Sequence, residues 1–179
     1  MKVFSFCLAL FAANLITAQV PYIEWQQTLG GERSDRLVTT LQTSDGGYLL
    51  AGYSDSDSNA MKSEDAIGTG YNVFDEDDWV TYHYEYVDIW LVKLDADGNL
   101  EWENTIGGDR DDFVSAMLET IDGGYIIAAN SESDISGDKT EDCWAPYLNS
   151  TDYWIIKLDA EGTIVWQNTI GGEYKDWIT

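Results

Sequence analysis

Short runs of apolar residues alternate along the chain with clusters of glycine and aspartate, a pattern that predicts strands joined by tight turns. The clearest set comprises residues 113–119, 125–130, 152–158 and 163–170. Apolar side chains occupy both alternating sets of positions in the third segment, as is typical of a strand packed between two neighbouring sheets. No segment shows a convincing helical period, so the pattern predicts an all-β fold.

Three copies of one phrase show that the chain is a repeat array. WQQTLGGERSD begins at Trp25, WENTIGGDRDD at Trp102 and WQNTIGGEYKD at Trp166. The copies are 77 and 64 residues apart, but both spacings leave 43 residues when the variable segments 54–87 and 131–151 are set aside. Because propeller blades of four strands repeat every 40–45 residues or so, the sequence predicts a β-propeller-like array of four-stranded antiparallel blades.

The predicted array is incomplete. Residues 19–31 are expected to form a lone outer strand of the ring-closing type, 32–108 a first blade with the long insertion 54–87, and 109–172 a second blade with the insertion 131–151. Residues 173–179 then begin a truncated third blade. Since closed propellers usually have four to eight blades, we expect the chain to be the N-terminal fragment of a longer protein whose remaining blades are its partners.

The first 18 residues have the pattern of a secretory signal peptide. Lys2 precedes an apolar run over residues 3–16, and the small residue Ala18 ends the segment. The chain is therefore expected to be secreted or displayed on the cell surface. Beyond this segment it has one cysteine, Cys143, which we interpret as a partly buried loop thiol, with intermolecular pairing as the alternative.

Composition excludes several classes of partner. The formal net charge of −24 opposes binding to nucleic acid or to anionic membrane surfaces. No other segment approaches the roughly 18 apolar residues of a membrane span, so no membrane insertion is expected. The apolar fraction of 44% and the aromatic fraction of 13% indicate a folded rather than a disordered chain.

Several phrases also resemble a known group of proteins. DYWIIKLDAEGTIVWQNTIGG from Asp152, TIDGGYIIAANS from Thr120 and SGDKTED from Ser136 are similar to repeats of large secreted β-propeller-type proteins of the Bacteroidetes. Many such proteins end in a signal for type IX secretion, which this chain lacks. The resemblance covers residues 88–177 closely and 25–65 well, whereas residues 66–86 depart from the pattern. It implies an extracellular or cell-surface location more firmly than any reaction.

Aromatic residues outside the repeated positions are the candidate ligand-binding residues. The inserted segment 79–86 alternates strictly, so we expect an extra strand that extends the first blade and presents an aromatic face that could stack on sugar rings. Packing of this face onto the blade is the alternative. The candidates are Trp79, Tyr82, Tyr84, Tyr86 and Trp144. In contrast, Trp25, Trp102, Trp166, Trp90 and Trp154 recur in the repeats and are predicted to lie in the core.

Calcium is the one metal that the acidic loops suggest. Oxygen ligands crowd both variable segments, and Asp75, Asp77 and Asp78 are the candidate ligands in the first. A solvated acidic loop is the alternative. The segment from Asp95 to Asn99 resembles the opening of a calcium loop, but a hairpin turn explains it without a metal.

No constellation of catalytic residues stands out. The chain has one histidine, His83, and no nucleophile is identifiable beside it. The sequence favours a non-catalytic exported repeat protein for surface display, adhesion or binding of a glycan or an extracellular protein. The alternatives are the propeller part of a carbohydrate-active or quinone-dependent enzyme and a purely structural repeat.

Overall fold

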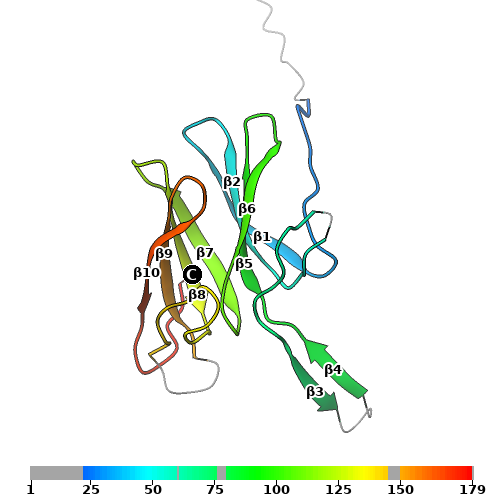
Figure 1. Cartoon of the computed structure of the whole chain (residues 1–179), viewed down its shortest axis with the longest axis vertical. Helices are drawn as coiled ribbons and strands as arrows, with labels where there is room; N and C mark the ends of the chain where they lie inside the picture. The colour runs from blue at the N-terminus through cyan, green and yellow to red at the C-terminus, as the bar shows by residue number, and fades with distance from the viewer. Residues whose placement is uncertain (1–21, 60, 76–79, 145–149, 179) are drawn as a thin grey trace, which may run out of the picture.

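The computed structural model describes residues 22–59, 61–75, 80–144 and 150–178, and this part of the chain is all-β with no helix. Its ten strands form two four-stranded antiparallel sheets and one two-stranded sheet. The expectation of an all-β fold is therefore confirmed. No closed sheet is present among the described strands, since the two larger sheets pack face to face (Figure 1).

Each large sheet is one repeat unit. The sheet of unit 1 has the order β1-β2-β5-β6, and that of unit 2 has the order β10-β9-β8-β7. Unit 1 comprises β1 (Asp35–Gln42), β2 (Tyr48–Ser54), β5 (Asp88–Leu94) and β6 (Leu100–Ile106). Unit 2 comprises β7 (Asp112–Glu119), β8 (Tyr125–Ser131), β9 (Asp152–Leu158) and β10 (Ile164–Ile170). The strands of unit 2 match the four predicted segments to within one residue.

Equivalent turns and registers recur in the two units. The β1–β2 turn has Gly46 at φ 91°, and the β7–β8 turn has Gly123 at φ 81°. The first strand of each unit also has a register shift at the same place, between Leu37 and Thr39 in β1 and between Val114 and Ala116 in β7. The repeated sequence therefore folds into the same local geometry twice.

The main core lies between the two units. The forward face of unit 1 consists of Leu49, Ala51, Ile89, Leu91 and Ile106, all of them at most 1% exposed. It packs against the back face of unit 2, which consists of Val114, Tyr125, Ile127, Ala129, Trp154, Ile156 and Leu158. Strands β5 and β9 have apolar side chains on both faces, as expected of strands in a sheet that packs against a neighbour on each side.

Residues 22–31 form no strand, contrary to the expectation for the segment 19–31, of which 19–21 lie outside the described residues. A β-strand needs a partner for its backbone hydrogen bonds, and none of the described strands pairs with this segment. It still packs on unit 1: Leu29 contacts the cluster of Trp90, Val92 and Leu94, and the ring of Trp25 lies against Gly98.

The prediction for the repeated tryptophans is correct for two and wrong for two. Trp90 and Trp154 are 8% and 0% exposed, as expected of core residues. Trp25 and Trp166, however, are 39% and 44% exposed. Trp102 accounts for Trp166: the indole of Trp102 donates to the carbonyl oxygen of Ala160 in the turn of unit 2, whereas no described unit follows Trp166. This position serves contacts between units, and its burial depends on the neighbour.

The inserted segment forms a separate hairpin. Strand β4 (Val80–Tyr84) pairs only with β3 (Tyr71–Asp75), and the two contact no other described strand. The prediction that this segment extends the first blade is therefore wrong. The hairpin projects from the body of the molecule instead (Figure 1).

Candidate ligand-binding site

Three tyrosines cluster at the base of the β3–β4 hairpin. The ring of Tyr71 stacks on that of Tyr84, with centroids 5.5 Å apart and planes at 21°. Tyr71 also contacts Tyr86, with centroids 5.4 Å apart. Tyr71 and Tyr84 remain 46% and 47% exposed, so the cluster offers aromatic surface to solvent. Of the predicted residues, the structure brings Tyr84 and Tyr86 together through Tyr71, which the sequence analysis missed.

The structure does not place the side chains of two further predicted residues, Trp79 and Tyr82. Trp79 lies outside the described residues, and Tyr82 lies in β4 opposite Val73 without a described side chain. Antiparallel pairing could have indicated Tyr71 from the sequence, had β3 been recognised as the partner strand.

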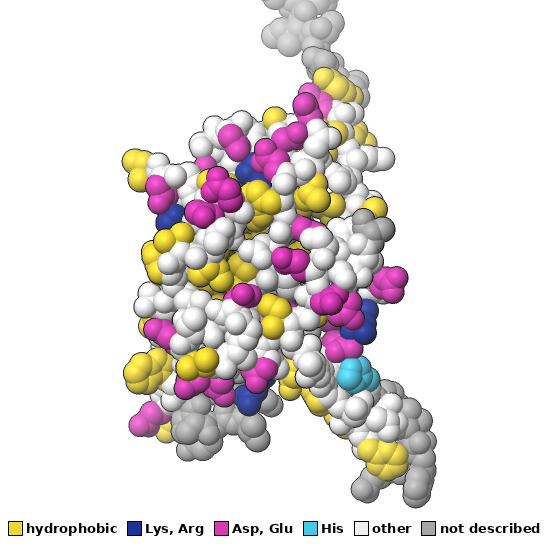
Figure 2. Space-filling view, in the orientation of Figure 1, with side chains coloured by type: hydrophobic (Ala, Val, Ile, Leu, Met, Phe, Trp, Pro, Cys, Tyr) yellow, Lys and Arg dark blue, Asp and Glu magenta, His cyan; other side chains and the backbone are white. Residues whose placement is uncertain are grey.

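A series of polar contacts on the other face of the hairpin ties it to unit 1. The Nδ1 atom of His83 lies 2.9 Å from Oδ1 of Asn72 across the hairpin, and its Nε2 lies 2.9 Å from Oε1 of Glu85. Glu85 in turn pairs with Arg33 of the body at 2.5 Å. Figure 2 shows the histidine at the junction between hairpin and body, beside acidic and basic side chains. Because successive side chains of a strand point to opposite faces, these polar groups lie on the other face of the hairpin from the stacked rings of Tyr71 and Tyr84.

Trp144 lies elsewhere, on unit 2. Its ring is 68% exposed, and its indole donates to the carbonyl oxygen of Thr169 at 3.4 Å. It lines an open groove of about 560 Å³ with Asn168, Ile170 and the residues of the preceding loop. The equivalent residue of unit 1 is Ile67, which contacts Gly137 in the loop of unit 2. Trp144 therefore occupies a position that faces the next unit, apart from the tyrosine cluster.

The acidic loops have a structural role that both units share. Asp65 accepts the backbone N–H of Ser58 at 2.9 Å, and Asp142 accepts that of Ile135 at 3.0 Å. Glu64 accepts the N–H of Thr105 at 2.6 Å, and Glu141 accepts that of Thr169. Residues 55–67 and 132–144 thus repeat each other, and the described difference between the variable segments is the hairpin of unit 1.

The predicted calcium ligands are only partly described. Asp75 ends β3, whereas Asp77 and Asp78 lie outside the described residues. Within the described ranges, no three His, Cys, Asp or Glu side chains are grouped to hold a metal ion. The carboxylate of Asp95 accepts the backbone N–H of Asp97 and Asn99, so the hairpin-turn interpretation of this segment is confirmed.

Two buried carboxylates lie where the units meet. Asp88, at the start of β5, accepts the N–H of Ile67 at 2.6 Å; Asp112, at the start of β7, accepts that of Gly108 at 2.8 Å. Both are fully buried. Burial raises the pKa of Asp88 to about 7, with a further increase from the charge of Asp112, and burial raises the pKa of Asp112 to about 6.

Perturbed carboxyls are typical of active sites, but these two are enclosed by loop backbone and each lies near a buried lysine, Lys62 for Asp88 and Lys139 for Asp112. Gly107 lies directly against the Asp88 carboxylate and leaves no room for a side chain, let alone a substrate. The arrangement is structural. The sequence signal was the aspartate that recurs at these strand starts in both units.

The partly buried thiol predicted for Cys143 is confirmed, and Lys139 Nζ lies 3.5 Å from its Sγ. Among the described residues no helix is long and apolar enough to cross a membrane. No model of a known protein family matches the chain, and a search of curated proteins finds no significant match.

Proposed function

We propose that the chain is a non-catalytic, exported repeat protein of the β-propeller type that binds glycans through the β3–β4 hairpin. The observation that carries the proposal is the half-exposed stack of Tyr71 and Tyr84. Aromatic rings offer apolar faces to the C–H groups of sugars at a low cost in side-chain entropy.

The other face of the same hairpin carries groups that can form hydrogen bonds with the hydroxyls of a glycan. Asn72 and His83 can donate or accept, and Glu85 accepts, all within the same hairpin. The ion pair with Arg33 fixes the base of the hairpin relative to unit 1. Small-ligand sites are lined mainly by apolar and aromatic side chains, and the tyrosine stack supplies such a surface.

The setting supports export and display. The N-terminal pattern over residues 1–18 is typical of a signal peptide, and the acidic surface suits a soluble exterior. In this proposal the two four-stranded units serve as the scaffold, and the hairpin is the binding element.

A glycan array followed by titration calorimetry on the best glycan tests the proposal. Tyr84→Ala is expected to weaken binding about tenfold, since loss of one aromatic contact costs about 1.4 kcal/mol. Tyr174→Ala is the matched control, because Tyr174 is 76% exposed on the C-terminal segment, away from the hairpin.

Three results would contradict the proposal. Equal loss of affinity in the Tyr84 and Tyr174 variants, or no bound glycan at all, would remove the hairpin as the site. Release of cleavage products from the bound glycan would show that the protein is an enzyme.

A further inference from the structure

The two outward faces of the molecule are equivalent to the two faces that pack together between unit 1 and unit 2. The forward face of unit 2 repeats that of unit 1, but none of the described strands covers it. Ile106 of unit 1 is 1% exposed, and its equivalent Ile170 is 53% exposed. Trp102 packs on Gly162 of unit 2, whereas its equivalent Trp166 is 44% exposed. The same face also presents Ile126, Ala128, Tyr153 and Ile155, all partly exposed.

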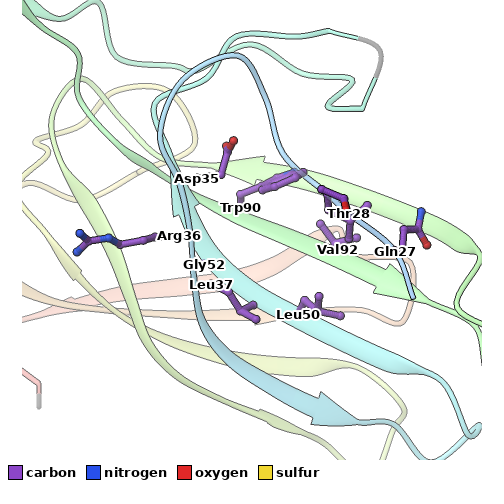
Figure 3. Close-up of a pocket in the computed structure, with 10 residues that line it drawn as sticks. Gln27, Thr28, Asp35, Arg36, Leu37, Leu50, Gly52, Trp90 and Val92 are labelled. Atoms are coloured by element: carbon purple, nitrogen blue, oxygen red, sulfur yellow. The ribbon is translucent and has the colours of Figure 1, made fainter. Parts of the chain in front are cut away.

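The back face of unit 1 is the complementary half. Val114, on the covered back face of unit 2, is 3% exposed, whereas its equivalent Leu37 in unit 1 is 60% exposed. A cavity of about 350 Å³ lies on this face, between the segment 27–29 and the sheet. Figure 3 shows Trp90, Val92 and Leu50 lining it. In unit 2 the equivalents Trp154, Ile156 and Ile127 fill the interface with unit 1.

We propose that chains associate head to tail, with the forward face of unit 2 of one copy packed against the back face of unit 1 of a second copy. The interface between unit 1 and unit 2 within one chain is the template for this contact. Such an interface joins two different surfaces, so it propagates into a ring or a filament.

The two terminal segments lie where the neighbouring copy would place its own strands. Leu29 packs on the cluster of Trp90 and Val92, just as its equivalent Ile106 packs on unit 2. Residues 25–31 therefore lie where strand β10 of the second copy would pack. At the other end, the N–H of Asp176 donates to the carbonyl oxygen of Thr151. The equivalent bond between the two units runs from the N–H of Asp112 to the carbonyl oxygen of Val87. Association therefore exchanges contacts within a chain for equivalent contacts between chains, as in domain swapping, and buries the rest of both faces.

Charge opposes the association at low ionic strength, because each copy has a formal net charge of −24. Salt screens this repulsion over a length of about 8 Å at physiological ionic strength. The association is therefore expected to strengthen as salt is added, as an apolar interface between like-charged molecules requires.

Sedimentation of two blocked variants, alone and mixed, tests the proposal. Ile170→Glu blocks the forward face of unit 2, and Leu37→Glu blocks the back face of unit 1. Each variant alone is expected to lose the oligomers of the wild-type chain. An equal mixture is expected to form dimers and nothing larger, because one open face of each kind remains.

Ile121→Glu is the matched control, since Ile121 is fully exposed in the β7–β8 turn, away from both faces, and this variant is expected to associate like the wild type. Circular dichroism checks that all variants fold. A wild-type chain that stays monomeric at high concentration and salt, or blocked variants that still self-associate, or a mixture without dimers, would each overturn the proposal.

Discussion

Asp88 shows how the protein holds a carboxylate in its interior. Its side chain is fully buried at the junction of the units, where it accepts a backbone N–H and lies near Asp112 and Lys62. Burial disfavours the charged form, and the raised pKa is the measure of that cost. The repeated aspartate is visible in the sequence, but its burial is a property of the packed loops around it.

This environment predicts a pH-dependent stability. The unfolded carboxyl has a pKa near 4, whereas the pKa of folded Asp88 is about 7, so the folded state binds the proton more tightly. Its contribution to stability is therefore present below about pH 4 and is lost as the pH rises toward 7. In urea unfolding, the free energy of unfolding of the wild type should decrease between about pH 4 and pH 7. The substitution Asp88→Asn should make this decrease smaller by up to about 4 kcal/mol.

Asp97→Asn is the control for this prediction, because Asp97 is an exposed residue of the β5–β6 turn. An identical pH dependence in the wild type and Asp88→Asn would show that Asp88 does not hold the proton.

Among the elements, the turns were the most predictable. Glycines that follow an acidic residue placed the turns of the two units correctly, since glycine readily adopts the positive φ that these turns require. The strands of unit 2 were also predictable, because their apolar runs end at such turns. The partner of β4 was not, because strict alternation shows that a segment is a strand and leaves its neighbour undetermined.

The turn glycines allow a matched comparison. Gly123 and Gly162 have φ of 81° and 85°, but a Cβ on Gly123 would meet nothing, whereas one on Gly162 would lie 2.9 Å from the ring of Trp102. Gly123→Ala is expected to cost about 1 kcal/mol of backbone strain. Gly162→Ala adds a clash between the units and should cost about 1–3 kcal/mol more in urea unfolding. Equal losses would show that Trp102 moves away freely.

At the scale of the whole molecule, the two units share one core. Because Trp154 of unit 2 is fully buried among residues of unit 1, neither sheet can bury its apolar face alone. We therefore expect the units to unfold together in a single transition. The exposure of Trp166 at the forward face of unit 2 follows from the same rule, since no described unit covers it as unit 2 covers Trp102.

Two tryptophan variants test this shared core. Trp154→Ala is expected to cost about 3–5 kcal/mol and to destabilise both units. Trp144→Ala, at a residue 68% exposed, should stay within about 0.5 kcal/mol of the wild type. Urea unfolding followed by near- and far-ultraviolet circular dichroism makes the comparison. Separate transitions in the two signals would show that the units fold independently.

The sequence by itself determined the all-β class, the repeat and the positions of turns and strands, because hydrophobic period and glycine placement act over a few residues. It also singled out Tyr84 and Tyr86. Tertiary structure decided that their segment projects as a hairpin, that Tyr71 completes the aromatic cluster, and that Trp25 and Trp166 are exposed. These outcomes depend on which surfaces meet, and contacts between residues far apart in the chain leave no local pattern.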